Sequence, residues 1–177
     1  MRIVLASGSP RRKELMEMLG VADLAVIPAK GEEVAVPGRG PEETVKALSA
    51  AKAAEVAAKC AADDVIVAAD TIVWLDGEIL GKPRDREDAA AMLRKLSGRE
   101  HAVYSGVSVM RFGRMISEVE ETKVSFRLLT EAEIGAYVDT AEPMDKAGAY
   151  AAQGKASLFV SGISGDFFNV MGLPLCR

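Results

Sequence analysis

The segment Val65–Thr71 reads VIVAADT, and it decides the class of fold. Its first five residues are all apolar, without the alternation of a half-exposed strand, which is typical of a strand covered on both faces. The strand is predicted to end at Asp70. A carboxylate would then lie at the carboxyl end of a buried strand, where open α/β sheets bind their ligands. Capping of the following turn is the alternative role for Asp70.

Strands and helices alternate on the amino-terminal side of this segment. Two strands are predicted over residues 2–6 and 23–28, and two helices over residues 10–20 and 41–61. The first helix is expected to have Ser9 as its N-cap and Pro10 at its first position. Its apolar stripe, at positions i, i+3 and i+4, is predicted to be Leu15, Met18 and Leu19.

Hairpins dominate on the carboxyl-terminal side. The turn signal Asp76-Gly77 predicts a short hairpin, and a longer one turns at residues 112–114. The first strand of the longer hairpin is expected to bury one face, made of Val103, Ser105, Val107 and Val109. Helices are predicted after Asp85 and after the capping box Thr130–Glu133, and a short strand near residues 158–161. This order predicts a mixed α/β sheet flanked by helices, not a purely parallel one.

Composition and charge exclude several classes of protein. The 177 residues include 22 Lys and Arg against 26 Asp and Glu, a net charge of -4, which disfavours a protein that holds nucleic acid electrostatically. No run approaches the ~18 apolar residues of a membrane span. The lone cysteines Cys60 and Cys176 form no metal-binding or disulfide pattern and favour a reducing compartment. The sequence therefore predicts a cytoplasmic protein without a membrane or nucleic-acid partner.

Several catalytic motifs are missing from the sequence. It contains no G-x-x-x-x-G-K-[ST], no G-x-G-x-x-G after a strand and no G-x-S-x-G. His101 is the only histidine, and a structural or surface role for it is favoured over membership of a catalytic triad. Catalysis would therefore depend on carboxylates, lysines and arginines, together with a hard metal bound through oxygen ligands.

A cluster of three cations and one separate lysine break local rules of helix composition. Arg11, Arg12 and Lys13 occupy a first helical turn, where the helix dipole disfavours cations, so that either a phosphate cradle or a solvated basic turn is indicated. Lys52 projects into the apolar face of the alanine-rich helix. It is either a snorkelling lysine or an ammonium directed at an anion. Glu32 and Glu33 could bring a second carboxylate near Asp70, as a metal-assisted phosphoryl site requires.

Five separated motifs make the chain resemble the Maf family of nucleoside triphosphate pyrophosphatases, from Leu5 to Pro174. These motifs are LASGSPRR at residues 5–12, ADT at 69–71, GKP at 81–83, DKAGAY with QG at 145–154, and NVMGLP at 169–174. Because all five motifs occur in the order found in the family, together they support the resemblance much more strongly than any one motif alone. Ser105 departs from the family pattern, which usually has threonine there.

The resemblance implies a single domain over residues 1–177, with an extended twisted sheet and two lobes around an active-site cleft. It also implies a homodimer that hydrolyses a nucleoside triphosphate to monophosphate and diphosphate with Mg²⁺ or Mn²⁺. Asp70 matches the catalytic acceptor of the family. Arg12, Thr71 and Gln153 match the positions that mark the subgroup acting on dTTP and UTP, as distinct from a relative acting on 7-methyl-GTP.

The same resemblance implies further substrate contacts at Ser7, Ser9, Arg11, Lys52, Lys82 and Lys146. The metal is expected on Asp70 and Glu33, and the proton of the attacking water is also expected on Asp70. These two roles compete, because a carboxylate bound tightly to a cation is a poorer base. The rival hypothesis is a regulatory nucleotide-binding protein that acts in septum formation, which would need the cations but no positioned base.

Overall fold

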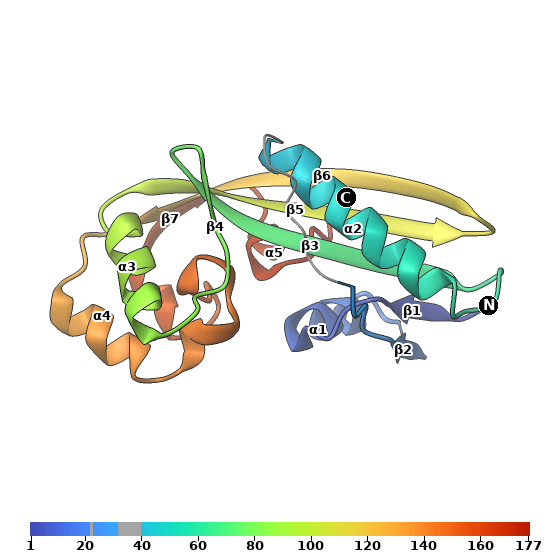
Figure 1. Cartoon of the computed structure of the whole chain (residues 1–177), viewed down its shortest axis with the longest axis horizontal. Coiled ribbons are helices and arrows are strands. Elements are labelled where there is room, and N and C mark those ends of the chain that lie inside the picture. The colour runs from blue at the N-terminus through green and yellow to red at the C-terminus, as the bar shows by residue number, and fades with distance from the viewer. Residues whose placement is uncertain (22, 32–39) are drawn as a thin grey trace. The chain divides into compact units, whose positions relative to one another are not determined.

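The computed structural model describes residues 1–21, 23–31 and 40–177 (Figure 1). The amino-terminal elements are β1 (Ile3–Leu5), α1 (Pro10–Met18), β2 (Leu24–Val26), α2 (Pro41–Ala57), β3 (Val65–Leu75) and β4 (Glu78–Leu80). The carboxyl-terminal elements are α3 (Arg86–Leu96), β5 (Glu100–Arg111), β6 (Arg114–Phe126), α4 (Glu131–Val138), η1 (Glu142–Asp145), η2 (Ala147–Ala149), η3 (Lys155–Phe159), β7 (Val160–Ser164) and α5 (Phe167–Met171). Glu32 and Glu33 lie outside the described residues.

One sheet contains the strands that the structure describes, in the order β2-β1-β3-β5-β6-β7, and β4 pairs with β3. β1 runs parallel to both β2 and β3, whereas the β3–β4 and β6–β7 pairs are antiparallel. The predicted mixed α/β sheet is therefore confirmed. Residues group into two compact units: residues 1–71, 105–120 and 172–177 form the first, and residues 72–104 and 121–171 form the second.

In the first unit, α2 packs on the sheet at Gly106 of β5 (Figure 1). A Cβ atom at Gly106 would lie 2.5 Å from the carbonyl carbon of Val45, so only glycine allows the helix this close to the strand. One turn further along, Ser49 hydrogen-bonds Ser108 over 2.8 Å, with both side chains fully buried. Together these contacts fix the helix that carries Lys52.

The prediction that the buried strand ends at Asp70 is wrong, because β3 continues to Leu75. Asp70 and Thr71 are interior strand residues. Their polar groups are satisfied by Lys52 and Arg12, so the strand continues through them without a break.

Two predictions of buried faces also fail. In α1 the buried residues are Leu15 and Met16, whereas Met18 and Leu19 are more than half exposed, because the helix ends at Met18. In β5 the alternation changes after Ser105: Ser108 is fully buried and Val109 is 39% exposed. The cause is α2, which covers the face that Ser108 shares with Gly106.

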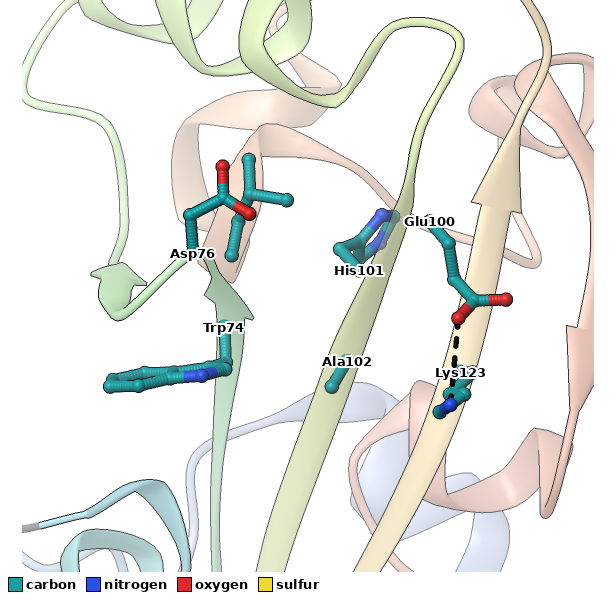
Figure 2. Close-up of a pocket in the computed structure, with 7 residues that line it drawn as sticks. Trp74, Asp76, Glu100, His101, Ala102 and Lys123 are labelled. Carbon is teal, nitrogen blue, oxygen red and sulfur yellow. Dashed lines mark ion pairs between the residues drawn. The ribbon is translucent and has the colours of Figure 1, made fainter.

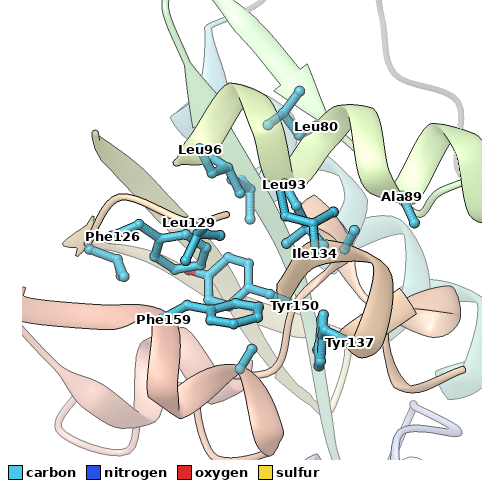
Figure 3. Close-up of a cluster of buried hydrophobic side chains, with 14 of the residues drawn as sticks. Leu80, Ala89, Leu93, Leu96, Phe126, Leu129, Ile134, Tyr137, Tyr150 and Phe159 are labelled. Carbon is cyan, nitrogen blue, oxygen red and sulfur yellow. The ribbon is translucent and has the colours of Figure 1, made fainter. Parts of the chain in front are cut away.

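The core of the second unit packs α3 and α4 around aromatic side chains of the strands and loops (Figure 3). Phe126 and Tyr150 meet edge to face at 4.9 Å between ring centroids, as do Tyr137 and Phe159 at 5.2 Å. The predicted N-cap at Asp85 and the predicted capping box at Thr130 are both confirmed. Three short 3-10 helices occupy much of the segment predicted to be irregular, and its strand lies at Val160–Ser164.

His101 is a structural residue of this second core, as the favoured interpretation predicted. It is 3% exposed, and its Nε2 is 2.8 Å from the Tyr150 hydroxyl. Burial lowers the pKa of His101 to about 4, so the ring is neutral at pH 7.

We expect this buried histidine to make stability depend on pH between about 6.5 and 4. The unfolded chain binds a proton there that the folded chain does not, so up to about 3 kcal/mol of the free energy of unfolding is lost as the pH falls through this range. Urea unfolding of the wild type and His101→Gln at several pH values measures the difference. Equal pH slopes for the two proteins would contradict the assignment.

The second unit also carries a pocket of about 180 Å³ (Figure 2). Its lining residues are Trp74, Leu75, Asp76, Glu100, His101, Ala102 and Lys123. Glu100 and Lys123 form an ion pair there at 3.6 Å. None of the candidate site residues that the structure describes lines this pocket.

Within the described ranges, no helix combines the length and the apolar character needed to cross a membrane.

Candidate active site

A buried ion pair forms the centre of the candidate site in the first unit. Lys52 Nζ on α2 lies 2.5 Å from Asp70 Oδ1 on β3, and the two side chains are 15% and 7% exposed. Charges removed from water are stable only when they are paired. Lys52 is therefore directed at an anion, as one of the two sequence interpretations proposed, and that anion is Asp70 itself.

Arg12 lies at the centre of a second group of contacts in the same unit. Its Nε donates to the Gly172 carbonyl oxygen over 2.7 Å, its Nη1 to Ser7 Oγ over 3.1 Å, and its Nη2 to Thr71 Oγ1 over 3.1 Å. The guanidinium thus joins three segments that are far apart in sequence. A solvated basic turn is excluded for Arg12, although it describes the exposed Lys13, which pairs with Glu17 at 3.5 Å.

Thr71 connects this group to the neighbouring strand. Its Oγ1 is 2.7 Å from Ser105 Oγ, and Ser105 is fully buried. Gly172 has a φ of +114°, which favours glycine, and an added Cβ would lie 3.4 Å from Thr71 Oγ1. The site residues predicted from the sequence did not include Gly172 or Ser105, although the motif at residues 169–174 contains Gly172 and Ser105 lies at a position compared with the family pattern.

The turn before α1 supplies the remaining residues of the first unit. Ser9 is the N-cap, but its side chain makes no capping bond; instead its backbone N–H donates to Ser7 Oγ over 3.2 Å. Ser7 is 8% exposed and Arg11 is half-buried. The positive end of the α1 dipole therefore lies beside the guanidinium of Arg12, an arrangement that favours an anion.

Three candidate residues belong to the second unit. Lys82 is exposed after β4, and Gln153 is exposed in the turn before η3. Lys146 is 14% exposed at its side chain, and its ammonium donates to the Glu142 carbonyl oxygen over 3.3 Å and pairs with Asp145. The structure therefore joins Ser7, Arg12 and Thr71 in one hydrogen-bonded group and Lys52 with Asp70 in another, both in the first unit, and it places these other three residues in the second unit.

The described residues offer one buried carboxylate to a metal at this site, that of Asp70. In the part of the chain that the structure describes, no three His, Cys, Asp or Glu side chains form a ready-made metal cage. Magnesium usually needs only one or two carboxylates, because substrate phosphates and water complete its coordination. Asp70 therefore fits a divalent cation bound together with a phosphate ligand, with Glu33 outside the described residues.

Comparisons with known proteins show which family and which fold the chain is similar to. The family model described as Maf-like protein matches residues 2–177. A dTTP/UTP pyrophosphatase of Carboxydothermus hydrogenoformans is 51% identical over 100% of this chain and 95% of its own. One of Bacillus velezensis is 48% identical over 99% and 92%. The solved Ham1 protein of Staphylococcus aureus shares the fold, with a TM-score of 0.50 and 15% identity over 90% of this chain and 91% of that one.

Proposed function

Since this chain belongs to the Maf family along nearly its whole length, we propose that it is a pyrophosphatase that hydrolyses dTTP and UTP to the monophosphate and diphosphate. Relatives of 48% and 51% identity bear that name. The observation that carries the proposal is the buried Lys52–Asp70 pair in the same unit as Arg12 and Thr71. A protein that only binds nucleotides needs cations but no buried carboxylate among them, so the regulatory alternative is disfavoured.

The first requirement is to hold a triphosphate on a protein whose net charge is -4. Attraction must come from local cations, and in the first unit we assign it to Arg12 and Lys52, while Lys82 and Lys146 of the second unit stay expectations from the family resemblance. Arg12 has a planar set of donors suited to phosphate oxygens, and it is held in place by Ser7 and Gly172. These cations would also stabilise the charge that develops on the departing diphosphate.

The second requirement is to activate water. In this proposal the oxygen of water bonds to the α-phosphorus, while the bond from that phosphorus to the bridging oxygen breaks and the diphosphate leaves with the electron pair. Asp70 accepts the proton of the water. Asp70 would also hold a divalent metal, which when bound neutralises charge on phosphate oxygens. A carboxylate accepts several partners at once, so the contact with Lys52 is compatible with both roles.

The direct test is release of diphosphate from UTP and dTTP by the purified protein with Mg²⁺ or Mn²⁺. We expect diphosphate and the nucleoside monophosphate in equal amounts. Binding of UTP without release of diphosphate would favour the regulatory alternative. Release of orthophosphate instead of diphosphate would contradict the site of cleavage.

Substrate choice gives a sharper expectation, because Gln153 can donate to a pyrimidine carbonyl and accept from N3–H at once. Cytosine reverses both polarities at that edge. Where the bound base excludes water from Gln153, each group left unpaired costs about 1 to 3 kcal/mol, so we expect kcat/KM for UTP to exceed that for CTP by about tenfold or more. Relative kcat/KM for UTP, dTTP, CTP, GTP and 7-methyl-GTP measures this.

Gln153→Glu serves as the matched variant, since glutamate keeps the shape of the side chain and replaces the donor by an acceptor. We expect it to lose the preference for UTP over CTP. Equal use of CTP and UTP by the wild type, or a preference for 7-methyl-GTP, would exclude the dTTP/UTP subgroup and leave pyrophosphatase activity standing.

A further inference from the structure

Gln153 lies in a turn that is held at both ends by side chains from outside it. On one side, the Ala151 N–H donates to Tyr137 Oη over 3.3 Å. On the other, the Lys155 N–H donates to Glu142 Oε1 over 3.0 Å. The residue proposed to read the base is itself exposed, yet the backbone around it is fixed.

The two holding groups are joined to each other. Tyr137 Oη donates to Glu142 Oε1 over 3.0 Å, so one carboxylate oxygen accepts from both the phenol and the backbone of Lys155. Tyr137 is 4% exposed and packs edge to face on Phe159 (Figure 3). Burial, and next the charge of Glu142, raise the pKa of Tyr137, so the phenol keeps its proton and remains a donor.

Gly154 is adapted to this arrangement. A Cβ atom at Gly154 would overlap the Glu142 carboxylate, so the turn passes directly against that group. The Gly154 N–H donates to the Ala151 carbonyl oxygen over 2.9 Å and closes the turn around Gln153. A larger residue at position 154 would therefore have to displace the Glu142 carboxylate from the turn.

Glu142 also holds a second candidate substrate residue. Its carbonyl oxygen accepts a hydrogen bond from Lys146 Nζ over 3.3 Å. The same residue thus anchors the ammonium of Lys146 through its main chain and the turn of Gln153 through its side chain. Sequence reasoning did not single out Glu142 or Tyr137, because neither breaks a local rule.

We propose that Glu142, acting with Tyr137, is a positioning residue that determines base specificity by fixing the turn of Gln153. The inference rests on the proposed function, in which Gln153 recognises the pyrimidine edge. A recognition side chain discriminates only when its backbone is held in one geometry. Loss of the hydrogen bonds that Glu142 and Tyr137 accept from this turn, which we call the clamp, should therefore reduce the preference for UTP over CTP more than it reduces turnover of UTP.

Three variants test this in the full-length protein. Glu142→Ala removes the carboxylate, and Tyr137→Phe removes only the hydroxyl while keeping the ring on Phe159. Each is expected to lower the UTP to CTP ratio of kcat/KM by about fivefold or more. Glu142→Gln, which keeps an acceptor oxygen, is expected to retain most of the ratio.

The matched control is Glu133→Ala. Glu133 is also a clamp, since its carboxylate accepts from Arg127 and from the Thr130 N–H in the same unit, but the turn of Gln153 is not among these partners. Removing it tests the effect of lost stability alone. We expect the UTP to CTP ratio of Glu133→Ala to equal that of the wild type.

A ratio within about twofold of wild type in Glu142→Ala would overturn the proposal, including when kcat falls equally for both nucleotides, as general destabilisation would cause. If Glu142→Ala does not fold, Tyr137→Phe decides by the same criterion. Gln153→Ala, measured in parallel, distinguishes failure of base recognition by Gln153 from failure of the positioning role of Glu142. If Gln153→Ala keeps the wild-type ratio of kcat/KM for UTP over CTP, Gln153 does not recognise the base. If Gln153→Ala loses that ratio while Glu142→Ala and Tyr137→Phe keep it, only the positioning role of Glu142 and Tyr137 fails.

Discussion

Asp70→Asn should lower kcat for UTP hydrolysis by at least ~100-fold, because the variant removes the proton acceptor and the one buried carboxylate that the described residues offer to a metal. The fold should survive at a lower stability, since asparagine keeps the shape of aspartate and an oxygen that accepts from Lys52 Nζ but leaves that ammonium without its counter-charge. Initial rates of diphosphate release, with circular dichroism and urea unfolding of the same samples, measure both effects.

Asp64→Asn is the matched control for this experiment. Asp64 is 6% exposed and accepts hydrogen bonds from Arg2 and from the Ala61 N–H in the same unit. Burial alone would raise the pKa of Asp64, but these bonds outweigh it and hold that pKa below its usual value. The control therefore removes an equally buried, cation-paired carboxylate outside the site, and its turnover should stay near that of the wild type. Near wild-type turnover by Asp70→Asn would contradict the mechanism in which Asp70 accepts the proton of the attacking water.

Lys52→Met should abolish most activity and also lower the free energy of unfolding by about 3 to 5 kcal/mol, because Asp70 would remain buried without its cation. From the sequence alone, replacing a snorkelling lysine by an apolar side chain of similar shape would be neutral or stabilising. Because the structure pairs Lys52 with Asp70, we expect Lys52→Met to destabilise the protein instead. Urea unfolding at pH 7 and UTP kinetics measure the two effects.

The pairing itself is tested by combining the substitutions. Lys52→Met with Asp70→Asn leaves neither charge behind, so the double variant should be more stable than Lys52→Met alone. Lys59→Met is the control, since the exposed Lys59–Glu55 pair, with its charged atoms 2.7 Å apart, is screened by water and should contribute little to the free energy of unfolding. An Lys52→Met variant as stable and active as the wild type would show that Lys52 takes no part in the site.

Local signals were enough to predict much of the fold. The Asp85 cap, the Thr130 capping box and the apolar run from Val65 each act over a few residues, and each is present in the structure. The end of β3 could not be predicted in this way. The polar groups of Asp70 and Thr71 are satisfied by Lys52, 18 residues away in the sequence, and by Arg12, 59 residues away.

In the candidate site, too, features with a signal in the sequence could be predicted, whereas contacts between distant residues could not. Arg12 and Lys52 could be selected because each breaks a local rule of helix composition, and Asp70 because it was expected at the end of a buried strand. The family resemblance selected Thr71 and Gln153 and supported Asp70. The bond between Lys52 and Asp70 could not be predicted, because it depends on where α2 packs against the sheet, and Gly106 sets that contact. Glu142 obeys every local rule and is revealed only by the bonds it accepts.

In the proposed reaction, water attacks the α-phosphorus of a pyrimidine nucleoside triphosphate at the site that contains Asp70. Hydrolysis of UTP in ¹⁸O-labelled water with Mg²⁺, followed by mass spectrometry of both products, tests it most directly. We expect ¹⁸O to enter the uridine monophosphate and the diphosphate to remain unlabelled. Label in the diphosphate, or equal rates of labelling with Asp70→Asn, would contradict it.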